Sequence, residues 1–108
     1  MKPDKNISVS EEVVTRLVNH FKPTRIYLFG SQARGEAACQ SDFDFLVVMD
    51  KVPARAYRLA QEAQTLMWGI PAAVDVLFIS SEKFDSLKST IGTLPEIVHR
   101  EGKSLYSA

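Results

Sequence analysis

Residues 28–48 decide the fold, and they have the sequence LFGSQARGEAACQSDFDFLVV. The stretch begins inside a short aromatic and β-branched segment, Arg25–Phe29, which is typical of a β-strand. It ends inside a second segment, 42–49, in which both faces of an extended chain are apolar apart from Asp42 and Asp44. Strands that are apolar on both faces are typical of the centre of a sheet. We therefore expect a central strand over 42–49.

The segments on either side of this stretch alternate between helical and strand periods. Ser8 and Glu11 have the spacing of a capping box, so a helix is expected to begin there and to end before Pro23. The other expected elements are a short helix at 32–35, a helix over Ala54–Trp68, a strand over Ala73–Ile79, a short helix from Ser80 or Ser81 to Leu87, a helix over Thr93–His99 and an edge strand over Lys103–Tyr106. This order predicts an α/β (α+β) fold, a two-layer sandwich with helices on one face of the sheet.

Composition limits the number of domains and the class of partner. With 108 residues, the chain is expected to form a single domain, 1–108. Thirteen Lys and Arg residues balance thirteen Asp and Glu residues, whereas proteins that bind nucleic-acid backbone or anionic membranes usually have a basic surplus. Neither partner is expected, and no apolar run is long enough to span a membrane. The single cysteine, Cys39, is compatible with the reducing cytoplasm.

Three aspartates lie inside expected strands, where acidic side chains are usually avoided. Asp42 and Asp44 are two residues apart, so both carboxylates leave the same face of a strand. Two carboxylates about 5 Å apart repel by roughly 3 kcal/mol at an effective dielectric constant of about 20. A cation is therefore expected beside them, and oxygen ligands favour Mg²⁺. Asp75 adds a third carboxylate if its strand lies beside that of Asp44. By itself, an Asp-x-Asp pattern is more often a strand end where Asp42 caps a turn and Asp44 faces water.

An expected anion site precedes the acidic pair. Gly30 and Ser31 stand where a strand is followed by the start of a helix. Glycine lets another group approach the backbone closely, and free N–H groups at a helix N-terminus bind anions. The Ser31 hydroxyl can donate to a phosphate oxygen, and Arg34 adds a cation in the first helical turn. A Gly-Ser turn alone is common, but combined with three aspartates it predicts a phosphate site beside a metal site.

The spacing of these residues resembles a known signature. Gly30-Ser31, ten intervening residues and then Asp42-x-Asp44 is similar to the motif of the DNA polymerase β superfamily of nucleotidyltransferases. The short chain and the Ala-Arg-Gly sequence after Gln32 resemble the minimal nucleotidyltransferases (MNT proteins). The resemblance implies a polymerase-β-like nucleotidyltransferase fold, in which helices back a mixed sheet. The segment 36–40 departs from relatives because it has no basic residue, so no extra phosphate contact is expected from it.

The resemblance also implies a role for each candidate residue. Gly30 and Ser31 are expected to hold the triphosphate of ATP or another NTP, and two Mg²⁺ ions are expected at the carboxylates. Asp75 is expected to assist one metal and the attacking hydroxyl. The implied catalytic and metal-binding residues are Asp42, Asp44 and Asp75, and the implied nucleotide-binding residues are Gly30, Ser31 and Arg34.

An acceptor is expected on another chain, because only about 60 residues follow the Asp-x-Asp motif and most are needed for the fold. By resemblance to MNT proteins, which are encoded beside HEPN-domain toxins, the chain is expected to be a cytoplasmic antitoxin. It would transfer AMP to a toxin hydroxyl and form an oligomer with its partner. Two alternatives remain: a binding module that neutralises its partner by contact alone, and a nucleotidyltransferase that modifies an antibiotic.

The helix expected over Ala54–Trp68 has two distinct sides. Its expected buried stripe consists of Ala56, Leu59, Ala60, Ala63, Leu66 and Met67. Tyr57, Gln61, Gln64 and Trp68 share another side, with a mixture of aromatic and amide groups that is typical of protein interfaces. The alternative is that Tyr57 and Trp68 are wedged against the edge of the core.

Overall fold

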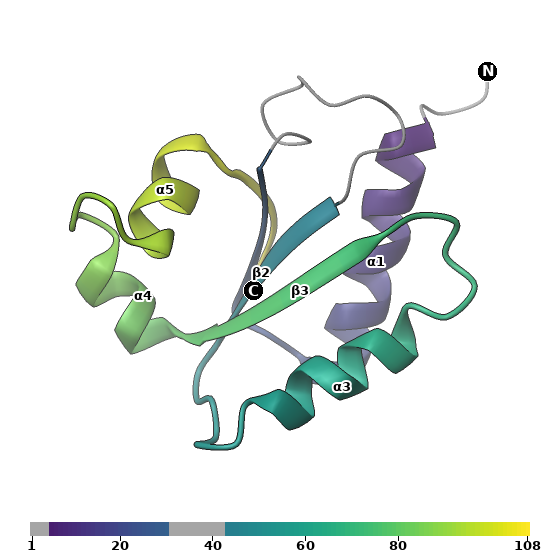
Figure 1. Ribbon diagram of the computed structural model, residues 1–108, viewed down its shortest axis with the longest axis horizontal. Coiled ribbons are helices and arrows are strands. Elements are labelled where there is room, and N and C mark those ends of the chain that lie inside the picture. The colour runs from purple at the N-terminus through teal and green to yellow at the C-terminus, as the bar shows by residue number, and fades with distance from the viewer. Residues whose placement is uncertain (1–4, 31–42) are drawn as a thin grey trace.

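A computed structural model describes residues 5–30 and 43–108 (Figure 1). Its elements are, in chain order, helix α1 (Lys5–Phe21), strands β1 (Arg25–Phe29) and β2 (Phe43–Met49), helix α3 (Tyr57–Leu66), strand β3 (Val74–Ser80), helices α4 (Ser81–Leu87) and α5 (Leu94–Glu101), and strand β4 (Lys103–Ser107). The short helix expected at 32–35 lies outside the described residues. Among the described helices, none has the length and apolar character that crossing a membrane requires.

The strands form a mixed sheet in the order β3-β2-β1-β4. β1 pairs antiparallel with both β2 and β4, while β2 pairs parallel with β3. The expected central position of β2 is confirmed, and so is the expected edge position of β4. The connection from β2 to β3 runs through α3, since parallel neighbours need a long crossover. The mixed α/β class is therefore confirmed.

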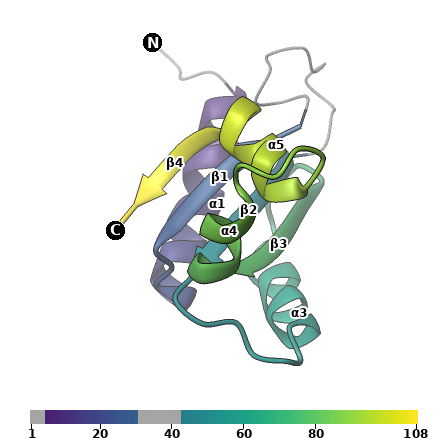
Figure 2. The same cartoon turned by 90° about the vertical axis from the view of Figure 1, so that its left-hand side faces the viewer.

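Helices cover both faces of this sheet, which corrects the expectation of helices on one face. α1 and α3 lie on one side, and α4 and α5 lie on the other (Figure 1, Figure 2). The side chains of β2 alternate accordingly. Phe43, Phe45 and Val47 are buried in the core with α1 and α3, whereas Leu46 and Val48 are buried with residues of α4 and α5. A strand with two apolar faces needs cover on both, because each exposed face would leave apolar area in water.

α1 extends further toward the N-terminus than expected. It already includes Lys5, so Ser8 lies inside the helix instead of capping it. Serine in a helix interior costs only about 0.5 kcal/mol relative to alanine, which is too little to end a helix that packs on the sheet. The apolar side of α1 packs on the sheet, where Val9, Val13 and Leu17 are buried.

α3 is shorter than the expected helix over Ala54–Trp68. It begins at Tyr57, and Ala56 at its N-cap makes no side-chain hydrogen bond to the first turn. At its other end, Arg16 of α1 donates from Nη1 to the carbonyl oxygens of Leu66 at 2.7 Å and Trp68 at 2.8 Å. A cation contributed by α1 therefore satisfies carbonyl groups that the end of α3 leaves without helical partners.

Side chains cap both α4 and α5, and of the two expected starting positions Ser80 and Ser81 it is Ser80 that caps α4. The Ser80 side chain accepts from the Lys83 N–H at 3.2 Å, and the Thr93 side chain accepts from the Glu96 N–H at 3.4 Å. The Glu96 carboxylate accepts from the N–H of Gly92 at 3.3 Å. These caps fix where the two helices begin above the second face of the sheet.

Candidate functional site

Two of the expected acidic residues are brought together by the parallel pairing of β2 and β3. Asp44 and Asp75 are register partners on these adjacent strands. Register partners in a parallel pair point to the same face, and neighbouring strands are about 4.8 Å apart. Asp44 is half-buried and Asp75 is exposed. The two carboxylates therefore stand side by side on the face that α4 and α5 cover, at the solvent-accessible end of the strands.

Gly30 lies against the first of these carboxylates. It follows β1 with φ of +77°, and a Cβ atom at this position would lie 2.6 Å from Oδ2 of Asp44. Glycine is thus required twice, for its left-handed backbone and for the space. The glycine was expected to let a phosphate approach the backbone, and the structure adds a close approach by Asp44. Nothing local in the sequence indicates this contact, because it depends on the pairing of Phe29 with Asp44.

The remaining candidates, Ser31, Arg34 and Asp42, lie outside the described residues, as do Cys39 and the loop at 36–40. Their roles stay predictions. Within residues 5–30 and 43–108, no group of three or more His, Cys, Asp or Glu side chains forms a metal site. The described donor set is the pair of carboxylates, and hard oxygen ligands of this kind are those that Mg²⁺ prefers.

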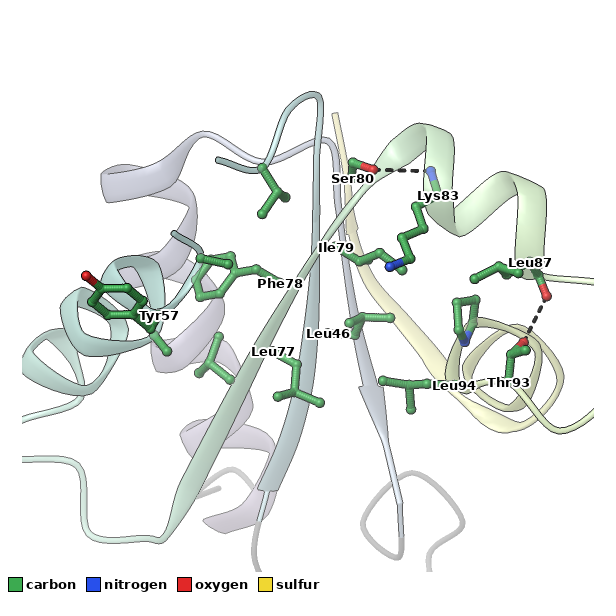
Figure 3. A pocket seen from close by; sticks show the side chains of 15 residues that line it. Leu46, Tyr57, Leu77, Phe78, Ile79, Ser80, Lys83, Leu87, Thr93 and Leu94 are labelled. Atoms are coloured by element: carbon green, nitrogen blue, oxygen red, sulfur yellow. Dashed lines mark hydrogen bonds between the residues drawn. The ribbon is translucent and has the colours of Figure 1, made fainter. Parts of the chain in front are cut away.

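An apolar groove runs along β3, with a volume of about 730 Å³. We call it the β3 groove. Figure 3 shows that it has two sides. Tyr57 and Phe78 lie on the side of α3, while side chains of β2, β3, α4 and α5 lie on the other. That second side is lined by Leu46, Leu77, Ile79, Lys83, Leu87, Thr93 and Leu94. Leu46 and Leu77 follow Asp44 and Asp75 by two residues on the same sheet face, so the acidic pair is next to the groove but does not line it.

Sequence reasoning did not find this groove. The residues that α4 and α5 contribute to it occupy positions that capping and core packing already explain, as Thr93 does at the N-cap of α5. The exposed fraction of Leu77, 46%, becomes visible only once β3 is placed at the edge of the sheet.

Ion pairs hold the helices that form the wall of the groove. Arg25 of β1 donates to Asp85 of α4 at 3.1 Å, and this hydrogen bond holds the pKa of Asp85 below its usual range. In α5, Arg100 donates to the carboxylate of Glu96 at 2.7 Å. This bond, together with the N–H of Gly92, lowers the pKa of Glu96. Both carboxylates are therefore stabilised in their ionised form.

The amide and aromatic side of α3 faces solvent. Tyr57 is 57% exposed and Trp68 is 85% exposed, so the alternative in which both wedge against the core is wrong. Gln61 is exposed, and Gln64 donates from Nε2 to the carbonyl oxygen of Val74 at 3.2 Å. On the opposite side, Ala63 and Met67 are buried, which confirms the centre of the predicted stripe.

Comparisons with known proteins place this chain in a family. The family model described as a nucleotidyltransferase domain matches residues 10–93. A toxin–antitoxin crystal structure with AMP-PNP is 26% identical, with a TM-score of 0.64, and the match covers 91% of this chain and 73% of that chain. A mutant of the toxin–antitoxin MntA–HpeT is 25% identical, with a TM-score of 0.65 and coverage of 92% and 72%.

A further structure, assigned as a nucleotidyltransferase from Sulfolobus solfataricus, shares the fold. It is 19% identical, with a TM-score of 0.64 and coverage of 98% of this chain and 90% of that chain. A search of curated proteins gave no significant match. The two toxin–antitoxin structures agree with the expected resemblance to MNT proteins. The matched residues include Gly30, Asp44 and Asp75. The chain therefore belongs to the nucleotidyltransferase domain family.

Proposed function

We propose that this chain transfers a nucleotidyl group, AMP in the simplest case, from an NTP to a hydroxyl group of a partner protein. The observation that carries the proposal is the row formed by Asp44 and Asp75 on adjacent parallel strands, with Gly30 packed against Asp44. Two neighbouring carboxylates are costly unless a cation or a proton is shared between them. Nucleotidyl transfer requires such a cation-binding pair beside a phosphate site.

The donor set fits a divalent metal. Asp44 and Asp75 supply oxygen ligands only, and Asp42 would add a third carboxylate one position before β2. We propose that these three aspartates hold two Mg²⁺ ions together with the phosphates of the NTP. When bound, the metal supplies positive charge that stabilises the entering and leaving oxygen atoms.

The other steps belong to side chains and backbone of this chain. Gly30 and Ser31 hold the triphosphate, and Arg34 adds positive charge beside it. Asp75 takes the proton of the acceptor hydroxyl as general base. The hydroxyl oxygen then forms a bond to the α-phosphorus, while the bond from the α-phosphorus to the pyrophosphate oxygen breaks. The products are the nucleotidylated hydroxyl and pyrophosphate, and the proton rests on Asp75.

The proposed acceptor is a toxin of the HEPN class in an oligomer with this chain in the cytoplasm. The similarity to toxin–antitoxin structures supports a toxin as partner. The exposed side chains of Tyr57 and Trp68 supply an aromatic surface for binding a partner protein. We further propose that residues 1–108 act as one domain, since the family match spans 10–93.

The same aromatic surface favours a second function, neutralisation of the partner by contact alone. In that case the chain would bind its partner tightly and transfer no nucleotide, and the acidic pair would be dispensable. The two functions therefore differ in whether substitutions of the acidic pair change the fate of the partner.

The test uses ATP labelled at the α-phosphate, Mg²⁺ and the protein encoded beside this gene. Wild-type chain is expected to place label on that protein. Asp44→Asn and Asp75→Asn are expected to lower the transfer rate by about 100-fold or more, which is typical of losing a metal ligand or a general base. The matched control is Asp50→Asn, an exposed aspartate that follows β2 at its other end, and its rate is expected to equal that of wild type.

Three results would contradict the proposal. Equal label with Asp44→Asn and wild type would remove the acidic pair from the reaction. Tight binding of the partner with no label from any variant would favour neutralisation by contact. Label on an aminoglycoside in place of the protein would identify an antibiotic-modifying enzyme.

A further inference from the structure

β3 is an edge strand, and its free side has a defined hydrogen-bonding pattern. The N–H of Phe43 donates to the carbonyl oxygen of Ala73 at 2.9 Å. Because backbone groups of alternate residues point to the same side of a strand, those of Asp75 and Leu77 also point toward β2. Those of Val76 and Phe78 point away from the sheet. For these two residues, the described part of the chain provides no hydrogen-bond partner on that side.

The pattern is verified by one side chain. The carbonyl of Val74 also points outward, and it accepts from Nε2 of Gln64 in α3 at 3.2 Å. The Gln64 amide therefore occupies the outward-pointing carbonyl of Val74, and the unpaired part of the β3 edge begins at Val76. Unpaired edge groups next to apolar surface are a template for another strand, and most proteins protect such edges with charges, prolines or bulges.

The β3 groove provides places for the side chains of an added strand. Successive side chains of a strand point to opposite faces of the sheet. In Figure 3, Tyr57 and Phe78 line one side of β3, and Leu77, Leu87 and Leu94 line the other. An extended segment that pairs with β3 would therefore place alternate side chains on two apolar surfaces. A helix or a rounded small molecule would use only one of the two.

The acidic pair forms the row of side chains next to the groove residues Leu46 and Leu77, on the same face of the sheet. Asp44 on β2 and Asp75 on β3 are neighbours across the sheet. A residue paired with Asp75 on an added strand would be the third member of this row, about 5 Å from Asp75 and on the same face. A hydroxyl group at that residue would stand next to the carboxylate that the proposed function assigns as its base.

We propose that the acceptor enters as an extended segment of the partner protein, adds to the free edge of β3 and presents its hydroxyl opposite Asp75. This inference rests on the proposed function for the fate of the hydroxyl, but the docking of the strand does not. If the segment runs antiparallel to β3, the residue immediately before the hydroxyl residue pairs with Val76. The residue two positions before it pairs with Leu77, and the residue three positions before it pairs with Phe78. All three are expected to be apolar, since the surfaces that they meet are apolar.

The probe is a family of labelled eight-residue peptides of the pattern Lys-Thr-(apolar)-(apolar)-(apolar)-Tyr-Thr-Lys, tested by fluorescence anisotropy without nucleotide. At least one is expected to bind saturably below about 1 mM. N-methylation of the first and third apolar residues, whose N–H groups pair with Phe78 and Val76, is expected to weaken binding by about tenfold or more. N-methylation of the middle apolar residue and the tyrosine, whose N–H groups point away from β3, is expected to leave affinity within about twofold.

Hydrogen exchange followed by NMR gives a second, residue-resolved measurement. In the free protein, the amide protons of Val76 and Phe78 are expected to exchange faster than those of Asp75 and Leu77, which point toward β2. The bound peptide is expected to slow exchange at Val76 and Phe78 selectively. Protection elsewhere with no change at these two amides would place the peptide at another surface and overturn the inference.

Matched variants test the apolar surface. Leu77→Lys changes a side chain that is 46% exposed in the groove, and is expected to weaken the peptide about tenfold. Ile91→Lys changes a side chain that is 91% exposed and does not line the groove, and is expected to leave affinity unchanged. Circular dichroism melts of both variants verify that they fold.

The outcomes separate this inference from the proposed function. A peptide that binds with the alternating N-methyl pattern but receives no label supports strand addition and contradicts transfer to this segment. Transfer to the partner protein that is equally fast with wild type and Leu77→Lys, with no peptide binding, overturns strand addition and leaves the proposed function standing. Binding that is equally sensitive to N-methylation at every position also overturns it, because it shows no strand register.

Discussion

At the scale of single residues, the absence of a side chain at Gly30 leaves the space that the carboxylate of Asp44 occupies. The backbone of Gly30 has φ of +77°, and the space that its side chain would occupy is taken by the carboxylate of Asp44. Any other residue would have to turn this carboxylate away from the row that it forms with Asp75. The glycine therefore fixes the position of an acid on a neighbouring strand in addition to shaping the turn after β1.

We predict that Gly30→Ala lowers nucleotide transfer far more than it lowers stability. The left-handed backbone costs alanine about 1–2 kcal/mol, and the added Cβ would stand 2.6 Å from Oδ2 of Asp44. Gly69→Ala is the matched control, since Gly69 has φ of +86° but nothing within 4 Å of its Cβ position. Urea unfolding and transfer rates are to be measured for both. Comparable activity of the two variants would show that the Asp44 contact does not matter for transfer.

At the scale of elements, α5 depends on a carboxylate that the protein keeps ionised. Glu96 is buried, its Oε2 accepts from Arg100 at 2.7 Å and its Oε1 accepts from the N–H of Gly92 at 3.3 Å. These hydrogen bonds lower its pKa relative to the unfolded chain. α5 also carries Leu94, which lines the β3 groove.

We predict an acid-dependent loss of stability from this site. A carboxylate with a lowered folded-state pKa stabilises the fold above its unfolded pKa of about 4.3, and this contribution disappears as the pH falls through the lower folded-state value. Glu96→Gln is expected to melt below wild type at pH 7, and the difference is expected to shrink as the pH falls below about 4. Thermal melts across this range measure it. Glu11→Gln, at an exposed position of α1, is expected to melt like wild type throughout.

At the scale of the whole molecule, one sheet serves two cores. Phe43 and Phe45 of β2 point into the core with α1 and α3, and Leu46 and Val48 of the same strand point into the core with α4 and α5. Neither core can lose β2 without exposing the other. We therefore expect the described part of the chain to unfold as one cooperative unit.

Truncation of the second core tests this expectation. Phe84 is fully buried, and its ring stacks on Tyr27 with centroids 5.3 Å apart. Phe84→Ala is expected to lower the free energy of unfolding by about 3–5 kcal/mol, because it removes a large apolar side chain and leaves a cavity. Far-UV circular dichroism and hydrogen exchange in α1 are expected to follow the same shifted transition. A separate, unshifted transition for α1 would show that the two cores unfold independently.

Local patterns predicted much of this fold, and long-range pairing accounts for the rest. The boundaries of β1 and the start of α5 at Thr93 follow from neighbouring residues, so the sequence was sufficient for them, whereas it left open whether Ser80 or Ser81 precedes α4. The cover on both sheet faces was already implied by the two apolar faces of 42–49, although only one was expected to be covered. α3 starts later than expected, at Tyr57, although Ala56 at its N-cap has no side-chain acceptor for a cap.

The candidate site divides in the same way. Asp44 and Asp75 stand out because acids are rare in strands, but that they are neighbours depends on the parallel register of β2 and β3. The contact of Gly30 with Asp44 depends on the antiparallel pairing of β1 with β2, and the two-sided groove depends on the position of β3 at the edge of the sheet. No spacing along the chain indicates them.

Trp68 is the chain's single tryptophan, and 85% of its surface is in water at the end of α3. Its ultraviolet emission is therefore a built-in optical reporter of whatever settles on that helix. A protein that covers the indole should shift the emission to shorter wavelength. A short strand that adds to β3 should leave the spectrum as it is, because Trp68 does not line the groove there. One unlabelled titration can thus distinguish arrival of the partner from entry of its acceptor segment.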